Sequence, residues 1–204
     1  MRGAPVVGYT PRLLPTITPR IVTPTSPANW RAWLRKHHEQ TTGIGLRLFK
    51  KDSGKQVLTY AQALDEALCF GWIDGRKDVY DADSWIQSFS PRRARSGWSK
   101  LNRAHAERLL KAGKMMPPGL AQVEAAKRDG RWAAAYDSSS AAALPADFLE
   151  ALAKNKRAEA FFRTLNKANA YAIAYRLQTA KKPETRARRM KLILQMIRDG
   201  KKFH

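Results

Sequence analysis

The spacing of hydrophobic residues changes along the chain and predicts an α+β fold that is predominantly helical. Trp30, Trp33 and Leu34 stand at i, i+3 and i+4, the stripe of a helix over residues 30–37 with Asn29 as its cap. Residues 44–49 instead alternate between apolar and other side chains, as in a short strand. We therefore expect a small antiparallel sheet packed with helices in the N-terminal part of the chain.

A second helix and a hairpin are predicted between residues 59 and 89. Thr59 and Gln62 have the spacing of a capping box, and Gly71 stands where the end of a helix needs a left-handed residue. The Asp74-Gly75 pair is a two-residue turn signal between strand-like segments at 72–73 and 76–80. Residues 84–89 add a further strand.

From residue 96 onward the pattern is helical almost throughout. Another helix spans about residues 118–128, and four short helices are expected in residues 144–204. The first helix of this region is predicted to turn one face to the core, formed by Trp98, Leu101, His105 and Leu109.

Two breaks in composition divide the chain into three parts. Six prolines interrupt residues 1–28, so we expect a disordered Pro-rich tail there. Residues 138–143 are small or polar and have no period, which indicates a linker. It separates an α+β unit at 29–137 from a helical unit at 144–204.

Cysteine usage and the tail predict where the protein acts. Cys69 is the single cysteine, so no intramolecular disulfide can form and a reducing compartment is the simpler expectation. The prolines break each early apolar run before it reaches signal-peptide length, and no later segment approaches the ~18 apolar residues of a membrane span. We expect a cytoplasmic protein without a transmembrane segment. Neither a cofactor nor a metal is predicted, because His37 and His38 lack further ligands at suitable spacing.

The net charge of +21, from 38 basic and 17 acidic residues, favours anionic partners such as nucleic acid, an anionic surface or an acidic protein. The charge is uneven, since residues 51–85 are net acidic while 86–132 and 150–204 are strongly basic. The acidic stretch borders the densest arginine cluster.

That cluster is the strongest candidate for binding chemistry. Pro91 interrupts a strand, three arginines follow on a short loop, and Ser96 or Ser99 caps a helix whose free N–H groups favour an anion. A phosphate- or carboxylate-sized site is predicted at Arg92, Arg93, Arg95, Ser96, Trp98, Ser99 and Asn102. Its candidate walls are Cys69, Trp72 and Asp74.

Each of these residues also has a structural interpretation. Trp72 and Trp98 fit the hydrophobic core, and Cys69 at an apolar helix end is typical of an inert small hydrophobe. The arginines can instead pair with the acidic hairpin, formed by Asp74, Asp78, Asp81 and Asp83.

Several separated motifs resemble one known family. They are Gly-Trp-Ile-Asp-Gly at 71–75, Phe89 with Pro-Arg at 91–92, Ser96 with Trp-Ser at 98–99 and Asn102, Gly-Arg-Trp at 130–132, and 180–186 with Arg189. In this order they resemble the YdeI/OmpD-associated or bacteriocin-protection family over about residues 30–202. The resemblance implies a YdeI-like domain followed by a helical OmpD-associated-type domain. The family name implies porin association and resistance to cationic peptides or bacteriocins, and the resemblance supplies no catalytic mechanism.

Three functions follow from these observations. The first is a non-enzymatic binding or stress-protection protein with an anionic ligand or acidic protein partner. The second is a sequence-nonspecific nucleic-acid binder that adds Lys181, Lys182, Arg186 and Arg189 to the arginine loop. The third is an enzyme on a small anionic substrate, with Cys69 or Asp74 beside the arginines. No catalytic residue is assigned.

Overall fold

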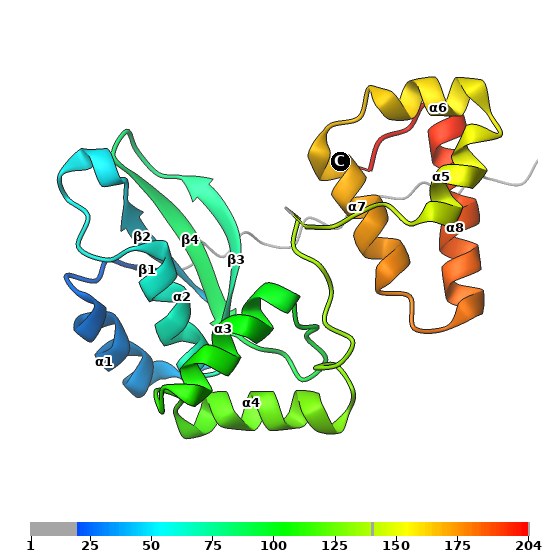
Figure 1. Ribbon diagram of the computed structural model, residues 1–204. Helices are drawn as coiled ribbons and strands as arrows, with labels where there is room; N and C mark the ends of the chain where they lie inside the picture. Colours follow the sequence, from blue (N-terminus) through cyan, green and yellow to red (C-terminus); the bar gives the residue numbers. More distant parts are fainter. Residues whose placement is uncertain (1–19, 140, 204) are drawn as a thin grey trace, which may run out of the picture.

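A computed structural model describes residues 20–139 and 141–203 and contains a sheet with helices followed by a group of helices (Figure 1). The helix-rich α+β class is as predicted. The first part comprises β1 (Ile21–Val22), α1 (Pro27–His37), β2 (Ile44–Phe49), a 3-10 turn (Lys51–Ser53), α2 (Tyr60–Cys69), β3 (Trp72–Val79), β4 (Ser84–Pro91), α3 (Lys100–Lys111) and α4 (Pro117–Arg128). The second comprises α5 (Ala146–Ala153), α6 (Lys156–Arg163), α7 (Lys167–Gln178) and α8 (Pro183–Arg198).

The sheet is mixed, which corrects the prediction of an antiparallel one. Its strand order is β1-β2-β4-β3, with antiparallel pairing except between β1 and β2. Gly45 N donates to Arg20 O at 3.0 Å and joins the short parallel strand to β2. Residues 20–28 therefore hold β1 and the start of α1 and do not belong to a disordered tail. A strand of two residues is too short to show an alternating pattern, so the surrounding prolines led to the prediction of disorder. Residues 1–19 of the predicted tail lie outside the described part.

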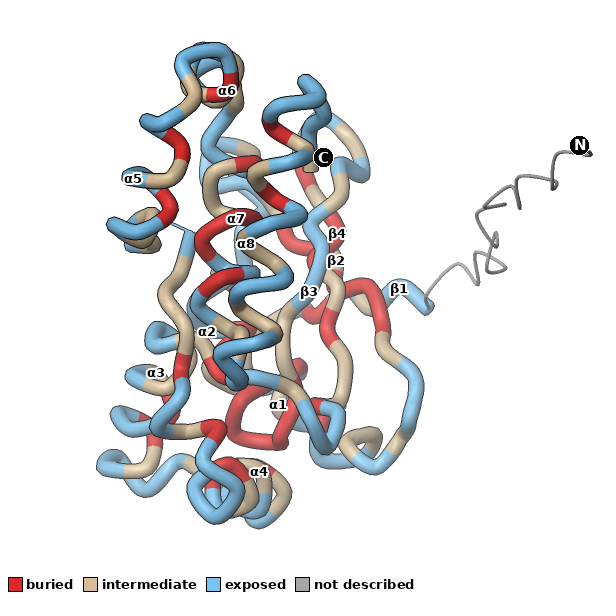
Figure 2. The backbone as a smooth tube through the Cα atoms, turned by 90° about the vertical axis from the view of Figure 1, so that its right-hand side faces the viewer, coloured by how far each residue is buried: buried red, intermediate tan, exposed pale blue. Residues whose placement is uncertain are grey.

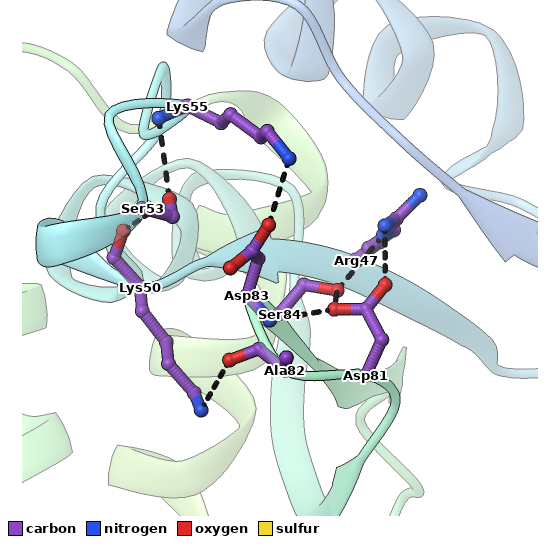
Figure 3. Close-up of polar contacts among 8 residues, drawn as sticks. All are labelled: Arg47, Lys50, Ser53, Lys55, Asp81, Ala82, Asp83 and Ser84. Atoms are coloured by element: carbon purple, nitrogen blue, oxygen red, sulfur yellow. Dashed lines mark hydrogen bonds and ion pairs between the residues drawn. The ribbon is translucent and has the colours of Figure 1, made fainter.

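The hairpin turn was predicted in the wrong place. Asp74 and Gly75 lie inside β3, and the chain reverses at 80–83 instead. Asp81 stabilises that reversal, because its Oδ1 accepts hydrogen bonds from Asp83 N at 2.9 Å and Ser84 Oγ at 2.7 Å (Figure 3). These bonds fix the turn near Asp81, and the Asp-Gly signal remains as an irregularity in the pairing of β3 with β4.

Helices α1 and α2 carry the main core of the first part. Trp30 is fully buried and its Nε1 donates to Ala63 O at 3.0 Å, so the indole links the two helices. The capping box of Thr59 and Gln62 is confirmed. Asn29 is not a cap, because α1 begins two residues earlier and Ser26 Oγ accepts from Asn29 N at 3.1 Å.

The predicted core face of α3 is only partly correct. Trp98 and Leu109 are buried, but Leu101 is 52% exposed. His105 also turns away from the core, since its Nδ1 lies 3.3 Å from Asp65 Oδ1. Ser99 caps the helix at its first turn, so Trp98 precedes α3 and its position does not set the helical face.

Helix α4 approaches α2 closely through a glycine. A Cβ built at Gly119 would stand 2.3 Å from Cys69 O and 2.7 Å from Leu68 O. Met116 N also donates to Cys69 O at 3.1 Å, so the start of α4 satisfies a carbonyl at the end of α2. The absence of a side chain at Gly119 therefore sets the distance between these helices.

The four C-terminal helices bury a cluster of their own, confirming the helical prediction for that part. Its centre is Phe148, Ile173, Leu177, Ile193 and Ile197. Buried positions run along β2 and β4 and separately along α7, as Figure 2 shows. Among the described helices none is both long and apolar enough to cross a membrane.

Replacing Gly119 by Ala is expected to destabilise the protein by ~1–3 kcal/mol, because the new methyl group overlaps backbone oxygens that cannot rotate away. Helix propensity alone predicts the opposite sign. The control is Gly75→Ala, whose Cβ meets Ser88 Cβ at an ordinary 3.5 Å; it should change the free energy of unfolding by less than about 1 kcal/mol. Urea denaturation of both variants measures the difference, and equal stabilities would contradict the close approach.

The division into two units makes a separate prediction. All six tryptophans precede residue 133, so tryptophan fluorescence reports the first unit only. Phe148→Ala should cost the C-terminal unit about 3–5 kcal/mol by removing a fully buried ring. Helical circular dichroism should then show an earlier transition while the fluorescence midpoint stays in place. A joint shift of both signals would mean that the two units unfold as one.

Candidate functional site

A cavity of about 600 Å³ opens where the end of the first unit meets helix α7. We call it the junction cleft, and its lining residues come from both units: Arg95, Gly97, Asp129, Arg131, Ala134, Tyr136, Tyr175, Gln178, Thr179 and Lys181. Three cationic side chains therefore share this cleft with one carboxylate.

That carboxylate is already neutralised by Arg131. Arg131 Nε donates to Asp129 Oδ1 at 2.9 Å and to Oδ2 at 2.7 Å, while Nη1 donates to Ser96 O at 2.8 Å. The hydrogen bond from Arg131 lowers the pKa of Asp129 below its ordinary value. Neither Arg95 nor Lys181 forms an ion pair with any residue that the structure describes. The local excess of positive charge in the cleft is thus carried by these two exposed side chains.

Tyr136 forms the wall between the cleft and the start of α3. Its backbone N donates to Trp98 O at 3.0 Å, and its O accepts from Lys100 N at 2.7 Å. Its ring meets Tyr175 of α7 edge-on, with centroids 4.9 Å apart. Burial raises the pKa of Tyr136, so its phenol stays protonated at neutral pH and can donate a hydrogen bond.

The next residue ties the two units together. Asp137 N donates to Gln178 Oε1 at 3.1 Å, and Gln178 Nε2 donates to Asp137 Oδ2 at 2.7 Å. Lys100 Nζ lies 2.7 Å from the other oxygen of the same carboxylate. These contacts place α7 against the chain that leaves the first unit.

Arg92 lies beneath the cleft wall and is only 6% exposed. Its guanidinium stacks on Trp98, with Cζ 3.7 Å from the ring centroid, and its Nη2 donates to Gly97 O at 2.6 Å. Burial lowers the pKa of Arg92 to about 10, and the charge of Arg131 acts in the same direction. The sequence placed Arg92 on a loop with Arg93 and Arg95, but only the latter two are exposed.

The other residues of the predicted anion site serve local structure. Ser96 Oγ accepts from Arg93 N at 3.1 Å, and Ser99 Oγ caps α3 by accepting from Asn102 N at 3.1 Å. Arg93 and Asn102 do not line the cleft. The structure therefore gathers Arg92, Arg95, Ser96 and Trp98 at or behind the junction cleft.

The predicted walls lie elsewhere. Cys69 is 1% exposed and faces Arg31, and burial raises the pKa of its thiol. Trp72 is fully buried, and its Nε1 donates to His38 O at 3.2 Å. Asp74 Oδ2 accepts from Tyr60 OH at 2.7 Å. None of the three lines the cleft.

Among the described residues no ion pair joins the acidic hairpin to the arginine loop, although the charge of Asp74 acts on Arg92. Asp81 pairs with Arg47 at 2.6 Å and Asp83 with Lys55 at 2.7 Å (Figure 3). Asp78 pairs with Arg76 at 2.8 Å. The partners come mainly from β2 and the segment after it, which the strand order places beside the hairpin.

The predicted nucleic-acid contacts divide into two groups. Arg186 donates to both oxygens of Asp147, at 2.6 and 2.9 Å, and Arg189 Nη1 donates to Arg176 O at 2.7 Å. These two arginines hold α8 to its neighbours. Lys181 and Lys182 are exposed, and Lys181 lines the cleft.

Sequence reasoning missed four residues that shape the cleft. Tyr136, Tyr175 and Gln178 gave no signal, because they come from segments that meet only in the folded chain. Arg131 did give one, since it belongs to the Gly-Arg-Trp motif at 130–132. In the described part of the chain, no three His, Cys, Asp or Glu side chains group in a way that could hold a metal ion.

Comparison with known families divides the chain at the same junction. Residues 22–122 match the model of a domain of unknown function, DUF8412. Residues 141–200 match the family described as bacteriocin-protection, YdeI or OmpD-associated. No curated protein and no solved structure matches the chain. The resemblance expected over residues 30–202 thus holds for the C-terminal part: the chain carries a YdeI/OmpD-associated domain at residues 141–200, behind an N-terminal domain of another family.

Proposed function

We propose that this protein is a non-enzymatic binding protein that holds an anionic ligand in the junction cleft. The observation that carries the proposal is the excess of cations there: Arg131 is paired with Asp129, while Arg95 and Lys181 have no ion-pair partner among the described residues. Two unpaired cations facing one cavity attract an anion and can form charge-assisted hydrogen bonds with it.

The size and lining of the cleft support a small molecule. Its volume of about 600 Å³ lies within the range of ligand pockets. Tyr136 and Tyr175 supply apolar ring surface with polar hydroxyl groups, and Thr179 adds a further hydroxyl. A ligand with one or two anionic groups and a compact body fits this combination.

The family description supplies the physiological part of the proposal. The matched family is described as bacteriocin-protection, YdeI or OmpD-associated. We extend to this chain a role in stress protection, in which binding of an anionic ligand or acidic partner protects the cell. A buried, unpaired thiol at Cys69 fits the reducing cytoplasm that we propose as its location.

The geometry gives little support to catalysis by Cys69 or Asp74, the two residues that the enzyme hypothesis placed beside the arginines. Cys69 is buried away from the cleft with a raised pKa, so the reactive thiolate is disfavoured. Asp74 is hydrogen-bonded to Tyr60 and does not reach the cleft.

Nucleic-acid binding is a second candidate, and the net charge of +21 favours it. The arginines expected to make this contact are partly used within the fold, since Arg186 and Arg189 bond to neighbouring helices. Binding of this kind would depend on the overall field rather than on the junction cleft.

A matched pair of double variants tests the cleft. Arg95→Gln with Lys181→Gln removes two cleft cations, whereas Arg93→Gln with Lys182→Gln removes two neighbouring cations outside it. Both variants lose the same net charge. The cleft variant should bind inorganic phosphate about tenfold more weakly in isothermal titration calorimetry, equal to ~1.4 kcal/mol, and the control should bind as the wild type does. Equal losses in both variants would mean that only the overall field matters.

Salt dependence tests the second candidate. If the chain binds nucleic acid, its affinity for a short DNA duplex should fall by roughly 10³-fold or more between about 50 and 200 mM salt, because counterion release drives such binding. Fluorescence anisotropy of a labelled duplex measures this. Absence of binding at the lower salt concentration would exclude this function.

A further inference from the structure

The stacked pair of Arg92 and Trp98 holds an unusual number of buried donors without acceptors. Arg92 is 6% exposed and Trp98 is 1% exposed. Arg92 Nε, Arg92 Nη1 and Trp98 Nε1 donate to no group in the described part of the chain. Trp85 Nε1 is also buried without an acceptor among the described residues, but it stands alone on β4, whereas the indoles of Trp30 and Trp72 bond to backbone carbonyls at 3.0 and 3.2 Å.

A buried guanidinium without a counter-ion is strongly unfavourable, because desolvation of the charge is not offset by an anion. The carboxylate whose charge acts on Arg92 is Asp74, but it forms no ion pair with Arg92 and accepts a hydrogen bond from Tyr60 at 2.7 Å. The positive charge of Arg131 repels that of Arg92. The ring of Trp98 offers only a cation–π contact. An anion beside Arg92 and Trp98 would neutralise the guanidinium and accept hydrogen bonds from the unpartnered N–H groups.

Three residues connect this pair to the junction cleft. Gly97 lines the cleft, and its carbonyl accepts the one hydrogen bond of Arg92 Nη2. Tyr136 also lines the cleft, packs against Gly97, and lies close enough to feel the charge of Arg92. Arg131 is the third of these residues, because it lines the cleft and its Nη1 donates to Ser96 O, next to Gly97. The pair therefore lies directly behind the cleft wall formed by these residues.

We propose that Arg92 and the indole N–H of Trp98 form an inner anion subsite, which receives the terminal carboxylate or phosphate group of a small molecule whose body lies in the junction cleft. This rests on the proposed binding function and names the class of its ligand. A terminal group is required because the pair is buried, and a polymer backbone cannot bring an internal phosphodiester to that depth. On this proposal the Tyr136 ring, which packs against Gly97 and meets Tyr175 edge-on, rotates to give the ligand access from the cleft.

The test begins with Arg92→Met and its matched control Arg93→Met. Both changes remove one arginine and one charge, from a buried and an exposed position respectively. Inorganic phosphate and acetate are titrated separately by calorimetry. Arg92→Met should lose at least tenfold in affinity for the anion that the wild type binds. It should melt at the same temperature as the wild type or higher, because the Met side chain keeps the packing on the Trp98 ring and no longer buries an unpaired charge. Arg93→Met should match the wild type in both respects.

A second measurement does not depend on the stability of that variant. The indole N–H signal of Trp98 in a ¹H–¹⁵N NMR spectrum of the wild type is assigned with Trp98→Phe. It should shift saturably as phosphate or acetate is added, with the same midpoint as the calorimetric titration. The signals of Trp30 and Trp72 serve as internal references, because their N–H groups are already bonded.

The outcomes separate the subsite from the proposed function. If anions bind and the cleft variant weakens them while Arg92→Met and the Trp98 signal remain unaffected, the cleft binds ligands and the inner subsite is wrong. If the wild type binds neither anion, the proposed function fails as well. A Trp98 signal that responds to duplex DNA but to neither small anion would overturn the assignment to a terminal group.

Discussion

The packing of Arg92 on Trp98 is the contact on which the end of the first unit depends. Arg92 N bonds to Gly71 O at 2.9 Å, so the end of β4 is tied to the turn after α2. Its guanidinium then fixes Gly97, and Trp98 meets Trp132 edge-on at 4.9 Å. One stacked pair thus joins the end of the sheet, the start of α3 and the chain that follows α4. The cation in this pair is desolvated and has no counter-ion among the described residues, so a nearby anion would stabilise it.

The cleft is a product of both domains, and neither matched family contains it alone. The match to the domain of unknown function ends at residue 122, and the match to the YdeI/OmpD-associated family begins at residue 141. Most of the first unit's contribution to the cleft, including Asp129, Arg131 and Tyr136, lies between these matches. The second unit adds Tyr175, Gln178 and Lys181. The shape of the cleft therefore depends on how the two domains meet.

The overall charge and the local charge of this protein describe different properties. The net charge of +21 is the sum over the whole chain and attracts any polyanion through a screened field. In the cleft, by contrast, the local charge comes from Arg95 and Lys181, because the carboxylate there, Asp129, is already paired with Arg131. Arginines elsewhere, such as Arg47 with Asp81 and Arg186 with Asp147, are neutralised by specific partners and hold the fold together. Counting charges along the chain cannot separate these two populations.

The sequence by itself determined the elements whose signals are local. The capping box at Thr59, the strand at 44–49 and the four C-terminal helices were predicted correctly, because caps and hydrophobic periods act within a few residues. It also identified Arg92, Arg95 and Trp98 as neighbours. Tertiary structure decided what depends on segments far apart in the chain. The parallel pairing of β1, the turn at Asp81, the burial of Arg92 and the cleft between Tyr136 and Tyr175 all arise from such contacts. The sequence does not distinguish a solvated arginine from a desolvated one, because burial depends on the segments that pack around the side chain.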